Sequence, residues 1–311
     1  TETPEPTDTP APTETPTPTE APSADTTIAE IQGTSDASPL DGKTVTTQGV
    51  VTAVYPTGNK NGFYIQMADG TAPADHTGST GVFVYNKDLS FVKQVKIGDS
   101  VTVTGQVSEY YNATQLTASK VEVLSNSLGT VTPKEIDQQA WADKGSRENY
   151  EGMLLKPTGL VVTDNYSLNT YGEIGLAFGD TPLKQPTAVG APDSAEAKAQ
   201  VEDNEARAIL LDDGSTWDYM KNADAKKSPL PYLDLDHPVT VGAEANFNEG
   251  VVLDYSFDKW RLQPTQQQVG TENMPVAFSD VREAAPKLGT DVTVASFNVL
   301  NYFPTLGNTD Q

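Results

Sequence analysis

Aromatic and basic side chains recur between residues 43 and 111 in a pattern that could bind nucleic acid. Single strands are held when bases stack on aromatic rings and Lys or Arg side chains neutralise phosphates. Some of these tyrosines alternate with core positions, which predicts that they face outward. The alternative is that the tyrosines cover a β-barrel and the lysines protect its edges. The predicted nucleic-acid-binding residues are Lys43, Lys60, Tyr64, Lys87, Tyr110 and Tyr111.

Acidic turns offer a second kind of chemistry, the binding of cations. Clustered carboxylate and carbonyl oxygens attract Ca²⁺, and two acidic turns occur, LDDGS at 211–215 and DLDH at 234–237. Neither has EF-hand spacing, so ordinary Asp turns are the better explanation and we predict no metal site. The 2 histidines, His76 and His237, are each expected to cap a loop rather than to form a catalytic pair.

A second set of aromatic residues lies farther along the chain. Such rings could stack on sugars, or they could pack into a core, and core packing is the favoured interpretation. The residues are Tyr166, Tyr171, Trp217, Tyr255 and Trp260.

Five short β segments must position the first set of residues. They cover 42–58, 61–70, 81–86, 98–116 and 118–125, with Gly, Asn and Asp between them. Closing them into a barrel removes exposed edges, and long first and fourth strands are typical of an OB-type barrel. Gly49 interrupts the first segment and suggests a bulge.

The remaining chain predicts a mainly β protein with two tandem OB-like β-barrels. The first barrel covers 27–128, a helical connector covers 129–150, and the second barrel covers 151–266 with an insertion at 181–206. The second repeats the strand order of the first.

The two ends of the chain have a different composition. Residues 1–26 are almost entirely Thr, Pro, Ala, Ser and acidic residues, which cannot form a core, so we expect a disordered Thr/Pro-rich tether. Residues 267–290 are predicted to be a linker. The apolar run at 291–311 predicts the first strand of a further, truncated domain.

Charge and cysteine content limit the function. The net charge is −23, so the chain as a whole should repel DNA unless a local patch or a divalent cation intervenes. Such charge also keeps an exported protein soluble. The chain has no cysteine and no apolar run long enough for a membrane helix. We expect a secreted or cell-surface monomer.

Seven segments occur in the order found in one family. They are TVTTQGVVTAVY (44–55), NGFYIQ (61–66), YEGML (150–154), TDNY (163–166), LDDGS (211–215), DYSFDKWRLQPT (254–265) and VASFNVLNYF (294–303). Together they resemble extracellular nucleases of the ExeM/NucH type over residues 27–303.

This resemblance implies a parent enzyme whose C-terminal endonuclease/exonuclease/phosphatase domain is a DNase I-like α/β sandwich. Such domains hydrolyse phosphodiesters with a divalent cation, Mg²⁺, Ca²⁺ or Mn²⁺. The family's first strand ends in an Asn at the phosphate and metal site, and the matching residue is Asn298. The other catalytic residues would follow Gln311, so we expect no cofactor and no nuclease activity in these 311 residues.

Two functions fit the sequence. The first is an accessory region that positions DNA, or the enzyme's own catalytic domain, in a secreted metal-dependent DNase. The alternative is a surface-tethered β-barrel protein that binds a sugar or protein, or acts as a spacer, without nuclease function.

Overall fold

The computed structural model describes residues 24–280 together with 289 and 294. Most of the predicted tether at 1–26, part of the linker at 267–290, and nearly all of 291–311 lie outside the described residues. Asn298 also lies outside them. Within the described part of the chain, no helix is long and apolar enough to cross a membrane.

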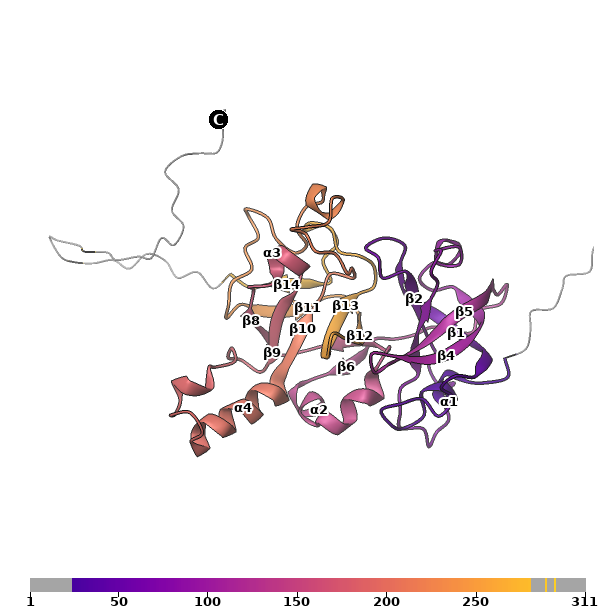
Figure 1. The fold of residues 1–311 in the computed structure, drawn as a ribbon, viewed down its shortest axis with the longest axis horizontal. Coiled ribbons are helices and arrows are strands. Elements are labelled where there is room, and N and C mark those ends of the chain that lie inside the picture. The colour runs from indigo at the N-terminus through magenta and orange to yellow at the C-terminus, as the bar shows by residue number, and fades with distance from the viewer. Residues whose placement is uncertain (1–23, 281–288, 290–293, 295–311) are drawn as a thin grey trace, which may run out of the picture. The chain divides into compact units, whose positions relative to one another are not determined.

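The first β region forms a closed barrel (Figure 1). Strand β1 pairs with β4 through residues 44–50 and with β2 through residues 50–55, so one long strand closes the barrel. The observed order, β1-β2-β3-β5-β4, confirms the expected OB-type barrel. The strands are β1 (Thr44–Tyr55), β2 (Gly62–Gln66), β3 (Gly81–Tyr85), β4 (Ser100–Tyr110) and β5 (Ala113–Val123).

The irregularity in β1 lies at a different residue from the one expected. The register with β2 shifts between Val51 and Ala53, which makes Thr52 the extra residue. Gly49 is instead closely packed, because a β-carbon there would lie 3.0 Å from Cδ1 of Ile28.

A one-turn helix, α1 (Ile28–Gln32), fills one part of the barrel core. Ile28 and Ile31 are fully buried in the same cluster as the barrel's valines. Thr27 and Glu30 fix the start of the helix by accepting each other's backbone N–H groups in a capping box.

The second β region forms one nine-stranded sheet, in the order β14-β11-β8-β9-β10-β13-β12-β7-β6. The mainly β fold is confirmed, and the region expected to be a second OB-like barrel is this single curled sheet. The two end strands, β6 and β14, come from the segments predicted as connector and linker, and they extend the sheet. The strands are β6 (Lys134–Ile136), β7 (Leu154–Pro157), β8 (Leu160–Asp164), β9 (Ile174–Phe178), β10 (Ala208–Leu211), β11 (Glu244–Phe247), β12 (Val251–Ser256), β13 (Lys259–Pro264) and β14 (Val276–Phe278).

This sheet curls around a single core, since every strand contributes a buried apolar side chain to one cluster. Trp141 belongs to the same cluster and stacks on Phe178, with ring centroids 5.6 Å apart. The helices are α2 (Gln138–Ala142), α3 (Leu168–Tyr171) and α4 (Ala195–Arg207), and a 3-10 segment covers Lys144–Tyr150. Helix α2 and the 3-10 segment lie within the segment expected to be a helical connector, and α4 lies mostly within the expected insertion.

The barrel and the sheet pack directly against each other, and we call this contact the joint. Tyr55 and Tyr64 of the barrel form a buried cluster with Val252 of β12, and Figure 1 shows β12 on the barrel side of the sheet. At a second point the backbones touch, because a β-carbon on Gly81 would lie 2.2 Å from the carbonyl oxygen of Gly152. The two β regions thus form one compact unit.

Candidate nucleic-acid interface

Two of the predicted binding residues, Tyr110 and Tyr111, protrude from the barrel at the β4–β5 turn. Their side chains are 61% and 72% exposed, and their rings meet edge to face with centroids 4.7 Å apart. Tyr110 pairs with Ala113, so Tyr111 and Asn112 form a two-residue hairpin loop. These exposed rings could stack on bases.

The backbone at this turn is strained. Tyr111 has φ 51° and Asn112 has φ 63°, as a type I′ turn requires. Asn adopts this left-handed conformation readily, but for a bulky side chain it costs on the order of 1–3 kcal/mol. An aromatic residue held in an unfavourable conformation at an exposed tip is consistent with a binding role.

Lysines are not gathered around the tyrosine pair. Lys43 is exposed. It lies at the same end of the barrel, since its carbonyl oxygen accepts the Val107 N–H near the end of β4. Lys87 is also exposed, but it follows β3, whose end pairs with Thr117 rather than with the turn. Glu109, the residue before Tyr110, is acidic and is part of β4 itself. The turn therefore offers rings for bases and little positive charge for phosphates.

The other two predicted residues, Lys60 and Tyr64, lie inside the joint. Tyr64 is 2% exposed and its hydroxyl donates to Oδ1 of Asp254 at 2.5 Å. Lys60 Nζ lies 2.8 Å from Oδ2 of the same carboxylate. The expectation that Tyr64 faces solvent is wrong, because the outward face of β2 is covered by β12.

The Asp254 carboxylate belongs to a buried polar network. Gln263 Nε2 donates to Oδ2 of both Asp254 and Asp212, at 3.0 Å each. Arg261 Nη1 lies 3.3 Å from Asp212 and 2.5 Å from Glu173. Buried charges persist only when they are paired in this way. The network thus fastens the barrel to the sheet.

The acidic turn at 211–215 lies beside this network. The Asp213 carboxylate accepts hydrogen bonds from the Tyr219 hydroxyl at 2.6 Å and from the Ser215 N–H at 2.8 Å. Burial, reinforced by the neighbouring Asp212, raises the pKa of Asp213 to about 7. The turn is a buried structural element, which agrees with the Asp-Gly interpretation.

The histidines occupy two separate loops. His76 Nε2 hydrogen-bonds to the Ser79 carbonyl oxygen, and His237 Nδ1 lies 2.8 Å from Oδ1 of Asp234. Hydrogen bonds from Thr271 and His237 lower the pKa of Asp234 to about 2. Across the described residues, no group of three or more His, Asp or Glu side chains could hold a metal ion.

The second set of aromatic residues divides between packing and exposure. Trp260 contacts Trp141 and Tyr255 edge to face, at centroid distances of 6.3 Å and 4.9 Å. Tyr166 and Tyr171 are instead 87% and 45% exposed near α3. The expected core packing thus applies to part of the set.

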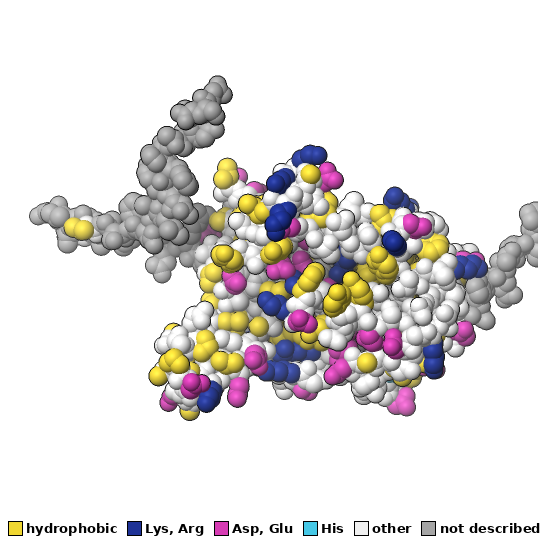
Figure 2. Space-filling model, viewed as in Figure 1, with side chains coloured by type: hydrophobic (Ala, Val, Ile, Leu, Met, Phe, Trp, Pro, Cys, Tyr) yellow, Lys and Arg dark blue, Asp and Glu magenta, His cyan; other side chains and the backbone are white. Residues whose placement is uncertain are grey.

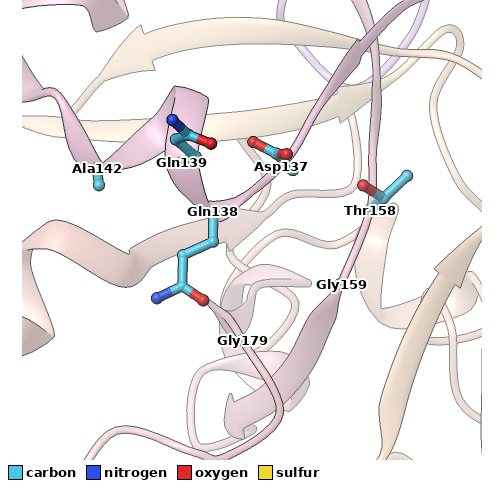
Figure 3. Close-up of a pocket in the computed structure, with 7 residues that line it drawn as sticks. All are labelled: Asp137, Gln138, Gln139, Ala142, Thr158, Gly159 and Gly179. Carbon is cyan, nitrogen blue, oxygen red and sulfur yellow. The ribbon is translucent and has the colours of Figure 1, made fainter.

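Two surface depressions in the described part of the chain lack basic residues. One, of about 540 Å³, lies beside α2, where Asp137, Gln138 and Thr158 point their polar groups around it (Figure 3). The other, of about 670 Å³, lies where β1 meets the ends of β12 and β13, and Glu249 is its only ionisable lining residue. Lys and Arg are interspersed with Asp and Glu on the face shown in Figure 2. Neither depression is suited to a phosphate.

Comparison with known proteins addresses the barrel. Residues 45–124 match a family model described as an OB-fold nucleic acid binding domain. None of the curated proteins matches this chain. The similar solved structures include "OBody AM1L10 bound to hen egg-white lysozyme", with 19% identity and a TM-score of 0.25 over 35% of this chain and 100% of that one.

Two further similar structures are a tRNA synthetase and an OB-fold domain of a replication protein. Asparaginyl-tRNA synthetase from Pyrococcus horikoshii has 21% identity and a TM-score of 0.20 over 27% of this chain and 20% of its own. The second OB-fold domain of replication protein A from Methanococcus maripaludis has 19% identity and a TM-score of 0.20 over 28% of this chain and 89% of its own. The family match and the closed five-stranded order identify residues 45–124 as an OB-fold.

Proposed function

We propose that the described region is a compact accessory unit that presents the β4–β5 turn of its barrel to a single nucleic-acid strand, within a secreted metal-dependent nuclease. The family match of the barrel supports nucleic-acid binding. The nuclease parent rests on the seven ordered segments that resemble the ExeM/NucH type. Asn298 would belong to that catalytic domain, and this region would supply no catalytic group.

The observation that carries the proposal is that part of the OB-fold's usual binding surface packs against the sheet, whereas the β4–β5 turn stays exposed. OB-folds bind oligonucleotides through the face of strands 2 and 3 and through the loops between strands 1 and 2 and between strands 4 and 5. Here Tyr64 on β2 and Lys60 in the β1–β2 loop are engaged with Asp254. Of these three elements, the β4–β5 turn is the one whose aromatic side chains remain exposed.

The charge around the turn predicts the kind of binding. Few lysines lie nearby, so few counterions would be released, and affinity should depend weakly on salt. Stacking is worth about 1–3 kcal/mol per base, which gives modest affinity with little sequence preference. Duplex DNA, whose bases are already stacked, should bind more weakly than a single strand.

The test is fluorescence anisotropy of a labelled oligothymidine strand at low salt. The variant Tyr110→Ala/Tyr111→Ala should lose most of the binding, whereas Tyr166→Ala, which removes an even more exposed ring from the sheet, should not. Equal binding by both variants would refute the assignment of the site. Absence of binding by the unaltered protein would refute nucleic-acid recognition itself.

The alternative, a tethered binding or spacer protein, is favoured by one observation. Coverage of the β2 face by β12 removes most of the surface that an OB-fold uses for nucleic acid. Oligonucleotide anisotropy distinguishes the two functions, and a plasmid-nicking assay with Mg²⁺, Mn²⁺ or Ca²⁺ tests the expectation that these 311 residues do not cleave DNA.

A further inference from the structure

A group of acidic side chains lies at the second contact of the joint, where Gly152 meets Gly81. Glu151 is 4% exposed, and its Oε1 accepts the Thr114 N–H of β5 at 2.8 Å. The Thr114 hydroxyl donates to Oε1 of Glu109 at 2.8 Å, so this threonine links the two carboxyl groups. Oε2 of each glutamate is buried, and no N–H or hydroxyl group among the described residues donates to it.

The charged groups that act on Glu148 and Glu151 within the described region are acidic. Glu148 comes from the 3-10 segment, Glu109 from β4, and Asp36 from the loop after α1. His76, from the β2–β3 loop, directs its ring to the Ser79 carbonyl oxygen instead. Ionised carboxylates buried together without a cation repel each other strongly, so such groups retain a proton instead.

We infer that Glu148 and Glu151 share one proton, and that this proton is a pH-sensitive latch holding the barrel against the sheet. With the proton bound, one carboxyl group donates to the other, and Glu151 still accepts the Thr114 N–H across the joint. When the proton leaves to solvent, two adjacent carboxylates repel, and Glu109 adds to the repulsion. The segment that carries Gly152 is then pushed away from the barrel.

The direction of the pH effect on the joint follows from how packing changes the pKa of Glu148 and Glu151. Burial, together with the hydrogen bond from Glu148, raises the pKa of Glu151 well above its usual range, and burial raises the pKa of Glu148 as well. A group whose pKa is raised on packing stabilises the packed state when protonated. The latch is therefore closed in mild acid and opens as pH rises through the raised pKa.

Hydrogen exchange of the full chain, followed by mass spectrometry, tests the latch. After correction for intrinsic exchange, protection of the β5 peptide around Thr114 should fall by at least about tenfold between about pH 5 and about pH 8, the change expected from one pKa unit of linkage. A peptide from β9 (Ile174–Phe178), within the sheet, serves as the internal control for global unfolding.

Two variants and a control complete the test. Glu151→Gln cannot ionise, so the β5 peptide should keep its acid-state protection at every pH. Glu148→Gln can donate its amide to the Glu151 carboxylate, so the loss of protection should move to a lower pH. Glu202→Gln, which alters an exposed carboxylate on α4, should behave like the unaltered protein. Constant protection in the unaltered protein, or the same pH-dependent loss in Glu148→Gln or Glu151→Gln, would overturn the inference.

Discussion

Lys60 Nζ and Asp254 Oδ2 lie 2.8 Å apart, although 194 positions separate the two residues in the sequence. Their side chains are only 11% and 10% exposed. Burial opposes ionisation of Asp254, but Lys60 and the hydrogen bonds from Tyr64 and Gln263 outweigh it and hold the pKa of Asp254 below its usual value. One carboxylate on the sheet thus binds the loop and the strand through which an OB-fold ordinarily recognises its ligand.

Substitution of Asp254 tests the strength of this contact. Asp254→Asn leaves the Lys60 ammonium group buried without a counter-charge, and breaking such a pair costs about 3–5 kcal/mol. The free energy of unfolding from urea denaturation at neutral pH should fall by that amount. Lys120→Met, which removes an exposed pair with Glu122, should change stability by less than about 1 kcal/mol. If Asp254→Asn had an unaltered midpoint, the network would not fasten the joint.

The buried Asp213 predicts how stability depends on pH. Its pKa is raised to about 7 in the folded protein, so the folded state binds a proton that the unfolded state has released. This contribution is fully present below about pH 4 and is lost as pH rises through about 7, with an upper limit of about 4 kcal/mol. Urea denaturation at several pH values should therefore give a free energy of unfolding that declines over this interval.

Asp213→Asn is the informative variant. The amide oxygen can still accept the Ser215 N–H, and the amide NH2 can donate to the Tyr219 hydroxyl oxygen instead of accepting from it, but the group does not titrate. Its free energy of unfolding should decline less with pH than that of the unaltered protein. An identical decline in both proteins would show that Asp213 is not responsible.

The sequence allowed the first barrel to be predicted almost completely. Alternating β-formers separated by Gly, Asn and Asp identify five strands, and their lengths are compatible with only a few ways of closing a sheet. The second region has similar strands, yet it opens into a sheet. Its extra strands, β6 and β14, are three residues long, which is too short for alternation to distinguish them from a connector.

The candidate site could be predicted only in part, for a related reason. Alternation along β2 identifies two faces of the strand, but it does not reveal that another part of the chain covers the outer one. Tyr64 and Tyr110 therefore look equivalent in the sequence, although one is buried against Asp254 and the other is exposed. The joint depends on pairs such as Lys60 and Asp254, whose separation in the sequence leaves no local pattern.

A substitution at Gly81 tests the second contact of the joint. An added methyl group would lie 2.2 Å from the backbone oxygen of Gly152, and a backbone atom cannot move aside without displacing the strand. We expect Gly81→Ala to lower the free energy of unfolding by about 1–3 kcal/mol. Gly145→Ala is the matched control, because the nearest atom to its added methyl group lies 3.5 Å away. Equal stability of both variants would mean that the backbones at 81 and 152 are not in close contact.

Tyr111 links stability to the proposed function. Asn is favoured at φ 51° in a two-residue hairpin loop, so Tyr111→Asn should relieve strain and raise the free energy of unfolding by about 0.5–1 kcal/mol. The same change removes a ring that is 72% exposed and should weaken binding of an oligothymidine strand. Tyr110→Asn lies in the strand, where Asn is disfavoured, so it should weaken binding without any gain in stability. Urea denaturation and anisotropy on the same two variants measure both effects. If Tyr111→Asn were more stable and bound equally well, the strained tyrosine would have no role in recognition, and the turn would not be the binding site.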